Sequence, residues 1–246
     1  MVGSDFNKKN IIQSLPYTQH IFANSAYTSL RLTNLAPACS NKISVIGLGV
    51  SSFYFEMPLN NQEITYEYPR FITICRLSDQ RKNIDLVIKA LSNIKSFVDF
   101  EYTIIGDGFL RPNLEKLVAD LGLSENIKFT GKVTKSEIRE YLHNSDLFIL
   151  TSSSSKKNVE GFGIVYLEAN ACGVPVLAAK EGGSAEAIQP GINGFFVNDI
   201  SVNSLTKVLS DFIKGKYQFN RDSCRNFANQ YNWSNITDKI ISIYNT

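Results

Sequence analysis

The chain has 246 residues, 43% of them hydrophobic and 20% charged, a composition typical of globular proteins with one large core or two small ones. Its net charge of +2 argues against a protein that binds nucleic acid by broad phosphate neutralisation. The start, MVGSDFNKKN, lacks a signal peptide's apolar stretch, and no apolar run approaches the roughly 18 residues of a membrane span. Four cysteines without a CxxC pair indicate free thiols. We therefore expect a cytoplasmic protein and leave contact with the inner face of a membrane open.

The first part of the chain predicts a single strand–helix–strand unit. Its strands correspond to HIFANS and KISVIGLGV and its helix to YTSLRLTNL, and the stretch FEMPLNNQEITYEYPR that follows is typical of a linker. One β-α-β unit cannot bury both of its faces without the rest of a sheet. We therefore interpret residues 1–58 as the remnant of a larger domain and residues 59–70 as the linker.

From Phe71 onward, short apolar runs alternate with helical patterns. The predicted strands are FITICRL, FEYTIIG, IKFTG, DLFILTS, PVLAA and GFFV, and at least two helices follow the last of them. This alternation predicts an α/β fold, in which a Rossmann-like parallel sheet over residues 71–230 has helices on both faces. Ligands of such sheets bind beyond the carboxyl ends of the strands, at a switch in strand order.

The segment NVEGFGIVYLEANACGVPV carries the strongest chemical signal. A polar loop with Lys156 and Lys157 leads into a helix that begins near Gly163, and a helix N-terminus facing a cavity is a ready site for a diphosphate. Glu160 before the helix and Glu168 on its second turn could each accept hydrogen bonds from hydroxyl groups. Hydroxyls on both sides of a diphosphate describe a nucleotide sugar. The alternative is a structural helix start with one solvated glutamate.

A diphosphate also calls for cations. Arg76 directly follows the first strand of the predicted parallel sheet, and Lys82 precedes the helix after that strand, so both should project from the ligand-bearing edge. Arg81 could share this task. Ordinary surface charges are the alternative interpretation.

The chain from about Phe71 to Val197 resembles the nucleotide-sugar-binding domain of the retaining glycosyltransferases of family 4, which have the GT-B fold. The matching landmarks are RLSDQRKNIDLVIKAL, IIGDG, IKFTGKV, YLHNSDLFILTSS, EGFGIVYLEANACGVPVLA and EGGSAEAIQPGINGFFV. FANSAYTSLRL and ISVIGLGVSSFYF resemble the end of the acceptor-side domain. NWSNITDKIISIY resembles the closing helix, over residues 231–246, that crosses back to it.

The resemblance implies roles for individual residues. Glu160 would hold hydroxyls of the donor sugar and Glu168 those of the ribose, while Arg76 and Lys82 would offset charge on the leaving nucleoside diphosphate. The remaining donor-binding residues would be the amides of Phe162 and Gly163 at the sugar, those of Ile164 and Val165 at the diphosphate, Val133 at the base, and Gly106, Gly108, Gly182 and Gly183 in loops close to the donor.

The resemblance further implies a retaining hexosyltransferase. It would transfer sugar from a GDP- or UDP-sugar to a glycan or lipid-linked acceptor in cell-surface polysaccharide synthesis, with GDP-mannose slightly favoured as donor. No DxD-type pair occurs near the site, which agrees with a metal-independent reaction that needs no further cofactor.

The chain departs from the family pattern at Cys75 and Asn83, where glycine is usual, and it has only the tail of the N-terminal domain. A missing domain or partner chain is therefore expected. The rival function is a non-catalytic nucleotide-sugar-binding module or an inactive fragment. A dinucleotide oxidoreductase is disfavoured because GLGVSS and GDGFLR lack the third glycine of the fingerprint. A GT-B epimerase or phosphorylase is a more distant alternative.

Overall fold

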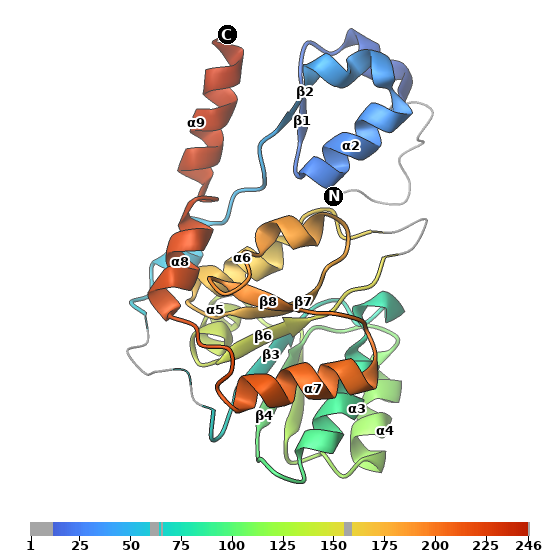
Figure 1. The fold of residues 1–246 in the computed structure, drawn as a ribbon, viewed down its shortest axis with the longest axis vertical. Coiled ribbons are helices and arrows are strands. Elements are labelled where there is room, and N and C mark those ends of the chain that lie inside the picture. The colour runs from blue at the N-terminus through green and yellow to red at the C-terminus, as the bar shows by residue number, and fades with distance from the viewer. Residues whose placement is uncertain (1–11, 60–63, 65, 155–158, 246) are drawn as a thin grey trace.

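The computed structural model describes residues 12–59, 64, 66–154 and 159–245. Figure 1 shows a six-stranded sheet enclosed by helices, which we call the large domain, and above it a small β-α-β unit with the C-terminal helix beside it. The elements of the small unit are η1 (Leu15–Tyr17), β1 (Ile21–Ala23), α2 (Ala26–Leu35), η2 (Pro37–Lys42) and β2 (Ile43–Val45).

A short helical turn, η3 (Ser52–Phe55), connects the small unit with the large domain. The elements of the large domain are β3 (Arg70–Ile74), η4 (Gln80–Lys82), α3 (Ile84–Ile94), β4 (Glu101–Ile105), α4 (Arg111–Asp120), β5 (Ile127–Gly131), α5 (Lys135–His143), β6 (Leu147–Leu150), α6 (Ile164–Ala171), β7 (Val176–Ala179), η5 (Gly182–Ala187), β8 (Gly194–Val197), α7 (Val202–Ile213) and α8 (Arg221–Asn229). The last helix, α9 (Trp233–Tyr244), leaves the large domain and runs beside the small unit.

The strand order of the large sheet is β5-β4-β3-β6-β7-β8, and each neighbouring pair is parallel. Helices α3, α4 and α7 cover one face of the sheet and α5, α6 and α8 the other (Figure 1). The predicted parallel α/β architecture is confirmed. The order runs outward in one direction from β3 and in the other from β6, so the switch point lies between the carboxyl ends of these two neighbouring strands.

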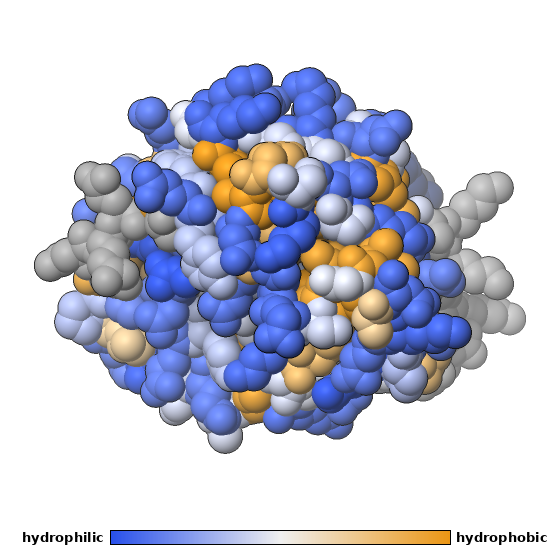
Figure 2. Space-filling model, turned by 90° about the horizontal axis from the view of Figure 1, so that it is seen from below, coloured by the Kyte–Doolittle hydropathy of each residue, from blue (hydrophilic) through white to orange (hydrophobic). Residues whose placement is uncertain are grey.

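The apolar patterns of the sequence explain this core. Every residue of β6 and β7 is buried, as expected for strands covered on both faces. The spacing of apolar residues along α3 makes it amphipathic, and the helix packs beside α4 and α7 on one face of the sheet. Ile88 is buried on this helix as well, because neighbouring helices cover α3 in addition to the sheet, whereas Leu86 is only partly buried. The face of the molecule in Figure 2 is mostly hydrophilic, with apolar patches between the polar side chains.

The strand boundaries differ from the prediction where polar loops take over the backbone hydrogen bonds. The first strand of the large domain was expected over 71–77 but ends at Ile74, and the strand expected over 146–152 ends at Leu150. The amide of Ser153, beyond the second of these strands, donates to the carbonyl of Arg81 at 2.8 Å instead of continuing a ladder. The predicted strands IKFTG and GFFV coincide with β5 and β8.

The small unit has little core of its own. Strands β1 and β2 pair in parallel, and a separate apolar cluster consists of Leu15, Ala36 and Cys39. The segment that follows the unit is tied to the end of the large domain, where the amide of Val50 donates to the carbonyl of Tyr231 at 2.7 Å. The domain limits at residues 58, 70 and 230 stay a prediction.

Two further expectations concern the whole chain. The four cysteines are free thiols; Cys39, Cys172 and Cys224 are buried, and Cys75 is partly exposed. None of the helices that the structure describes has the length and apolar character needed to cross a bilayer.

Candidate functional site

The site is built where the carboxyl ends of β3 and β6 meet. The loop after β3 carries Arg76, whose side chain is exposed and makes no hydrogen bond or ion pair with the described residues. This loop is fixed by the next loop along the sheet, since the amide of Leu77 donates to the carbonyl of Asp107 at 3.0 Å. A cavity of about 170 Å³ beside Arg76 lies between apolar residues of α3 and α4 and includes neither Lys82 nor Glu160.

Gly106 and Gly108 are needed for this close approach of two loops. A Cβ atom at Gly106 would lie 1.9 Å from the carbonyl oxygen of Cys75, and one at Gly108 would lie 2.3 Å from the carbonyl carbon of Leu77. The two glycines therefore hold the loop that carries Arg76 in place. Contact of these glycines with a donor stays a prediction.

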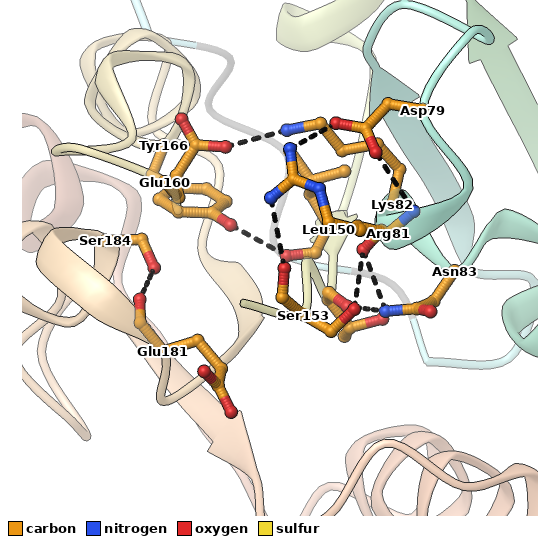
Figure 3. Close-up of polar contacts among 11 residues, drawn as sticks. Asp79, Arg81, Lys82, Asn83, Leu150, Ser153, Glu160, Tyr166, Glu181 and Ser184 are labelled. Carbon is orange, nitrogen blue, oxygen red and sulfur yellow. Dashed lines mark hydrogen bonds and ion pairs between the residues drawn. The ribbon is translucent and has the colours of Figure 1, made fainter. Parts of the chain in front are cut away.

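Lys82 and Glu160 form the central contact of the site. Lys82 ends the turn η4, and its Nζ lies 2.7 Å from Oε2 of Glu160, with 17% and 29% of the two side chains exposed. Figure 3 shows the ammonium and the carboxylate pointing toward each other across the space between the two loops. The structure thus brings together two residues that the sequence placed after different strands.

Asn83 holds the turn that presents Lys82. It occupies the N-cap position of α3 with φ 55°, in the left-handed region, which asparagine tolerates better than most residues. Its side chain makes no capping hydrogen bond to the first turn of α3. Instead the side-chain amide donates to the carbonyls of Arg81 (2.9 Å) and Thr151 (2.6 Å) and so ties η4 to the end of β6.

The helix α6 follows Glu160 closely along the chain, with Gly163 at its N-cap position. The backbone of Gly163 has φ 80°, and a Cβ atom there would lie 2.5 Å from the ring of Tyr166. Because the first amides of a helix have no partner inside it, those of Ile164 and Val165 are free of intrahelical bonds. The ring of Phe162 is 3% exposed and so packs inward while its backbone remains at the helix start.

The glycine pair after β7 supports the backbone of Glu160. The amide of Gly183 donates to the carbonyl of Glu160 at 3.0 Å. A Cβ atom at Gly182 would lie 2.8 Å from that same carbonyl oxygen, and one at Gly183 would lie 2.0 Å from the carbonyl oxygen of Gly161. Side chains at these positions would displace the Glu160 loop. Whether the glycines contact a donor stays a prediction.

Glu168 lies on the second turn of α6 and is mostly buried. Burial raises the pKa of its carboxyl group to about 7, and the charge of Lys135 and a hydrogen bond from the Tyr54 hydroxyl partly oppose this effect. Sequence reasoning missed both partners. Tyr54 lies in the segment that connects the small unit with the large domain. Arg139 holds this segment, because its guanidinium carbon stacks 3.8 Å from the centroid of the Phe53 ring.

Three further hydroxyl groups follow β6. Those of Thr151, Ser152 and Ser154 are buried and have no hydrogen-bond partner among the described residues. The run of serines after a buried strand is the sequence signal that could have marked them. Lys156 and Lys157, in the same loop, lie outside the described residues. Val133 follows β5 at the same edge of the sheet and packs partly buried against the core.

Other features of the surface lie apart from this site. A depression of about 660 Å³ borders the edge strand β5 and is lined by residues such as Glu101 and Lys128. Within the described ranges, no group of three or more His, Cys, Asp or Glu side chains could hold a metal ion.

Comparisons with known proteins show the family to which the chain belongs. The family model Glycosyl transferases group 1 matches residues 60–240. The GDP-mannose-dependent alpha-(1-6)-phosphatidylinositol monomannoside mannosyltransferase of Mycobacterium tuberculosis is 31% identical over 198 residues, which are 77% of this chain and 51% of that protein. The amylovoran biosynthesis glycosyltransferase AmsK of Erwinia amylovora is 29% identical over 185 residues, which are 74% of this chain and 45% of that protein.

Solved structures share the fold. HepE of Anabaena in complex with UDP and glucose superposes with a TM-score of 0.80 at 21% identity, over 99% of this chain and 68% of that one. The apo lipopolysaccharide outer core galactosyltransferase WaaB gives a TM-score of 0.74 at 19% identity, over 92% of this chain and 61% of that one. The chain spans about half the length of the curated relatives it matches. Since the family model covers most of its residues, the chain belongs to the group 1 glycosyl transferases.

Proposed function

We propose that the protein is a retaining glycosyltransferase of family 4, which transfers a sugar from a nucleotide-diphosphate sugar to a glycan or lipid-linked acceptor. The observation that carries this proposal is the contact between Lys82 and Glu160 beside the N-terminus of α6, at the switch point of the sheet. A cation, a carboxylate and free helix amides in one place provide complementary groups for a phosphate and for sugar hydroxyls.

The start of α6 binds the donor. The amides of Ile164 and Val165 face the diphosphate, and the backbone amides of Phe162 and Gly163 face the sugar. The helix dipole adds to the attraction of an anion at this end. Gly163 allows the helix to start here, because its backbone is left-handed and a side chain would meet the ring of Tyr166.

The ion pair between Lys82 and Glu160 occupies the site before the donor arrives. Phosphate oxygens compete for the ammonium group of Lys82, and its departure leaves the carboxylate of Glu160 able to accept hydrogen bonds from the sugar. As the bond between sugar and phosphate breaks, negative charge grows on the diphosphate. Lys82 and Arg76 stabilise that charge more in the transition state than in the ground state.

Glu168 and Val133 bind the nucleoside. Glu168 accepts hydrogen bonds from the ribose hydroxyls, and its hydrogen bond with Tyr54 orients the carboxyl group toward them. Val133 lies against the base. Neither glutamate acts as the nucleophile or acid of a glycosidase in this proposal, because both position the donor.

The proposal has several finer features that concern the donor base, the stereochemistry and the metal. Curated relatives are described as GDP-mannose-dependent, whereas solved relatives contain UDP, so we favour GDP-mannose slightly over UDP-sugars. The acceptor arrives on the face of the leaving group, which retains configuration. Arg76 and Lys82 take the role that Mg²⁺ has in other transferases, and the reaction needs no further cofactor.

The proposal includes further partners and a location. Val45 on β2 and Trp233 and Ile241 on α9 are about half exposed, which suits a covering N-terminal domain or partner chain that also binds the acceptor. The name of the Erwinia relative supports a role in cell-surface polysaccharide synthesis. Free cysteines fit the cytoplasm, and a lipid-linked acceptor would bring the protein to the inner face of the membrane.

A thermal-shift titration with GDP- and UDP-sugars tests the proposal. One of them should raise the melting temperature of the wild type, because a ligand that binds the native state stabilises it. Lys82→Ala should lose most of this shift, whereas Lys89→Ala, which removes an exposed cation on α3, should keep it. No shift with any nucleotide sugar would contradict the proposal. A shift without glycosyl transfer or donor hydrolysis would favour the non-catalytic binding module.

A further inference from the structure

Glu186 joins the large domain to the small unit. It lies on η5, and its carboxylate accepts hydrogen bonds from the amides of Ala26 (2.7 Å) and Tyr27 (2.9 Å), the first two residues of α2. The N-cap residue Ser25 accepts from the amide of Thr28 at 3.0 Å. Thus three of the amides that a helix start leaves unpaired are satisfied, two of them by a side chain from the other part of the molecule.

The loop before α2 also touches the loop that carries Glu160. A Cβ atom at Gly183 would lie 2.7 Å from the hydroxyl oxygen of Ser25, and one at Gly161 would lie 3.3 Å from the side-chain nitrogen of Asn24. Gly183 in turn donates its amide to the carbonyl of Glu160. Three loops are therefore packed together, with no room for a side chain at Gly183.

Tyr231 makes a second connection between the same parts. Its ring lies 5.6 Å from the ring of Phe162, in the Glu160 loop, and its carbonyl accepts from Val50 of the connecting segment. A Cβ atom at Gly47 would lie 3.2 Å from the Tyr231 ring. Burial and then the charge of Glu186 raise the pKa of Tyr231.

We propose that Glu186 is a positioning residue that fastens α2 against the large domain and thereby holds the Glu160 loop in the conformation that binds the donor sugar. The contacts are contiguous from Glu186 through the start of α2 and Ser25 to the glycine pair and Glu160. A shift of α2 removes one wall of this packing. The donor half of the inference rests on the proposed function, whereas the coupling between α2 and the loop does not.

Hydrogen–deuterium exchange of the full chain without ligand tests the coupling. In Glu186→Gln, which removes the charge and one acceptor, amides at residues 26–30 and also at 160–166 should exchange about tenfold faster. Glu186→Asp keeps the charge, and its exchange rates in both segments should lie between those of the wild type and of Glu186→Gln. This variant also tests the coupling if the glutamine variant does not fold. The control Glu140→Gln, at an exposed position on α5, should change neither segment. Faster exchange confined to residues 26–30 would overturn the inference, because Glu186 would then only cap a helix.

Donor binding separates a failure of this inference from a failure of the proposed function. With GDP-mannose or UDP-glucose, whichever the wild type binds, Glu186→Gln should raise the dissociation constant about tenfold, and Glu186→Asp should restore part of the affinity. In turnover the loss should appear mainly in the donor KM rather than in kcat. Unchanged affinity in the glutamine variant would contradict the donor half. If the wild type binds no nucleotide sugar, the proposed function fails and the exchange result still decides the coupling.

Discussion

The large domain and the small unit are built from the same β-α-β pattern but differ in how completely the pattern is covered. In the large domain helices lie on both faces of six strands, and β6 and β7 are fully buried. In the small unit two strands and one helix bury a cluster of three residues, and Leu30 and Val45 remain about half exposed. The difference shows that the large domain carries its own stability, whereas the small unit depends on its contacts with the large domain and α9.

The largest expected effect concerns the buried charges of the large domain. The carboxylate of Asp146, at the start of β6, is fully buried and accepts from Arg70 Nε at 2.9 Å and Arg221 Nη2 at 3.1 Å. Asp146→Asn leaves two guanidinium groups without their counter-charge and should lower the free energy of unfolding by about 3–5 kcal/mol. Urea denaturation measures this. Asp238→Asn, at an exposed position on α9, should lower the free energy of unfolding by less than about 0.5 kcal/mol. Equal effects of the two substitutions would contradict the stated difference in stability between the large domain and the rest of the chain.

The second effect concerns Glu168, where the connecting segment meets the large domain. Its pKa is raised from 4.5 to about 7, so the folded state binds more protons than the unfolded state between these pH values. The contribution of Glu168 to the free energy of unfolding should therefore be fully present below pH 4.5. It should fall by about 2–3 kcal/mol as the pH rises through 7. Glu168→Gln should flatten this decline. Tyr54→Phe removes a hydrogen bond to the charged form and should shift the decline to higher pH. A wild-type stability that rises over this range would contradict the assignment.

The third effect concerns the turn that presents Lys82. Asn83→Ala should cost about 2 kcal/mol, because alanine is strained at φ 55° and makes neither side-chain hydrogen bond. Asn83→Gly removes only the hydrogen bonds and should cost about 1 kcal/mol. Urea denaturation of the two variants compares them. A glycine variant less stable than the alanine variant would show that backbone strain does not matter at this position.

The smallest effect is expected on the exposed side of α9. Ile241 is 50% exposed, so Ile241→Gln should change the free energy of unfolding by no more than about 0.5 kcal/mol. Ile236→Gln, at the buried position of the same helix, is the matched contrast and should cost several times more. A large loss for Ile241→Gln would mean that another part of this chain covers that face.

The order of strands and helices in the large domain could be predicted because each element has its own apolar period, as α3 and β6 show. That Lys82 and Glu160 lie at the same edge of the sheet was predictable, since both follow strands of one parallel sheet, but their direct contact was not. The hydrogen bond between Tyr54 and Glu168, the cap that Glu186 provides for α2 and the left-handed backbone of Asn83 were not predictable. Each depends on segments far apart in the sequence that come together only after folding.

The central claim is that a diphosphate binds between Lys82 and the start of α6. A crystal structure of the protein with the nucleoside diphosphate of its donor tests it most directly. We predict phosphate oxygens within hydrogen-bond distance of the amides of Ile164 and Val165, with the ammonium of Lys82 turned from Glu160 to the phosphate. Phosphate bound elsewhere, with the contact between Lys82 and Glu160 intact, would contradict the account.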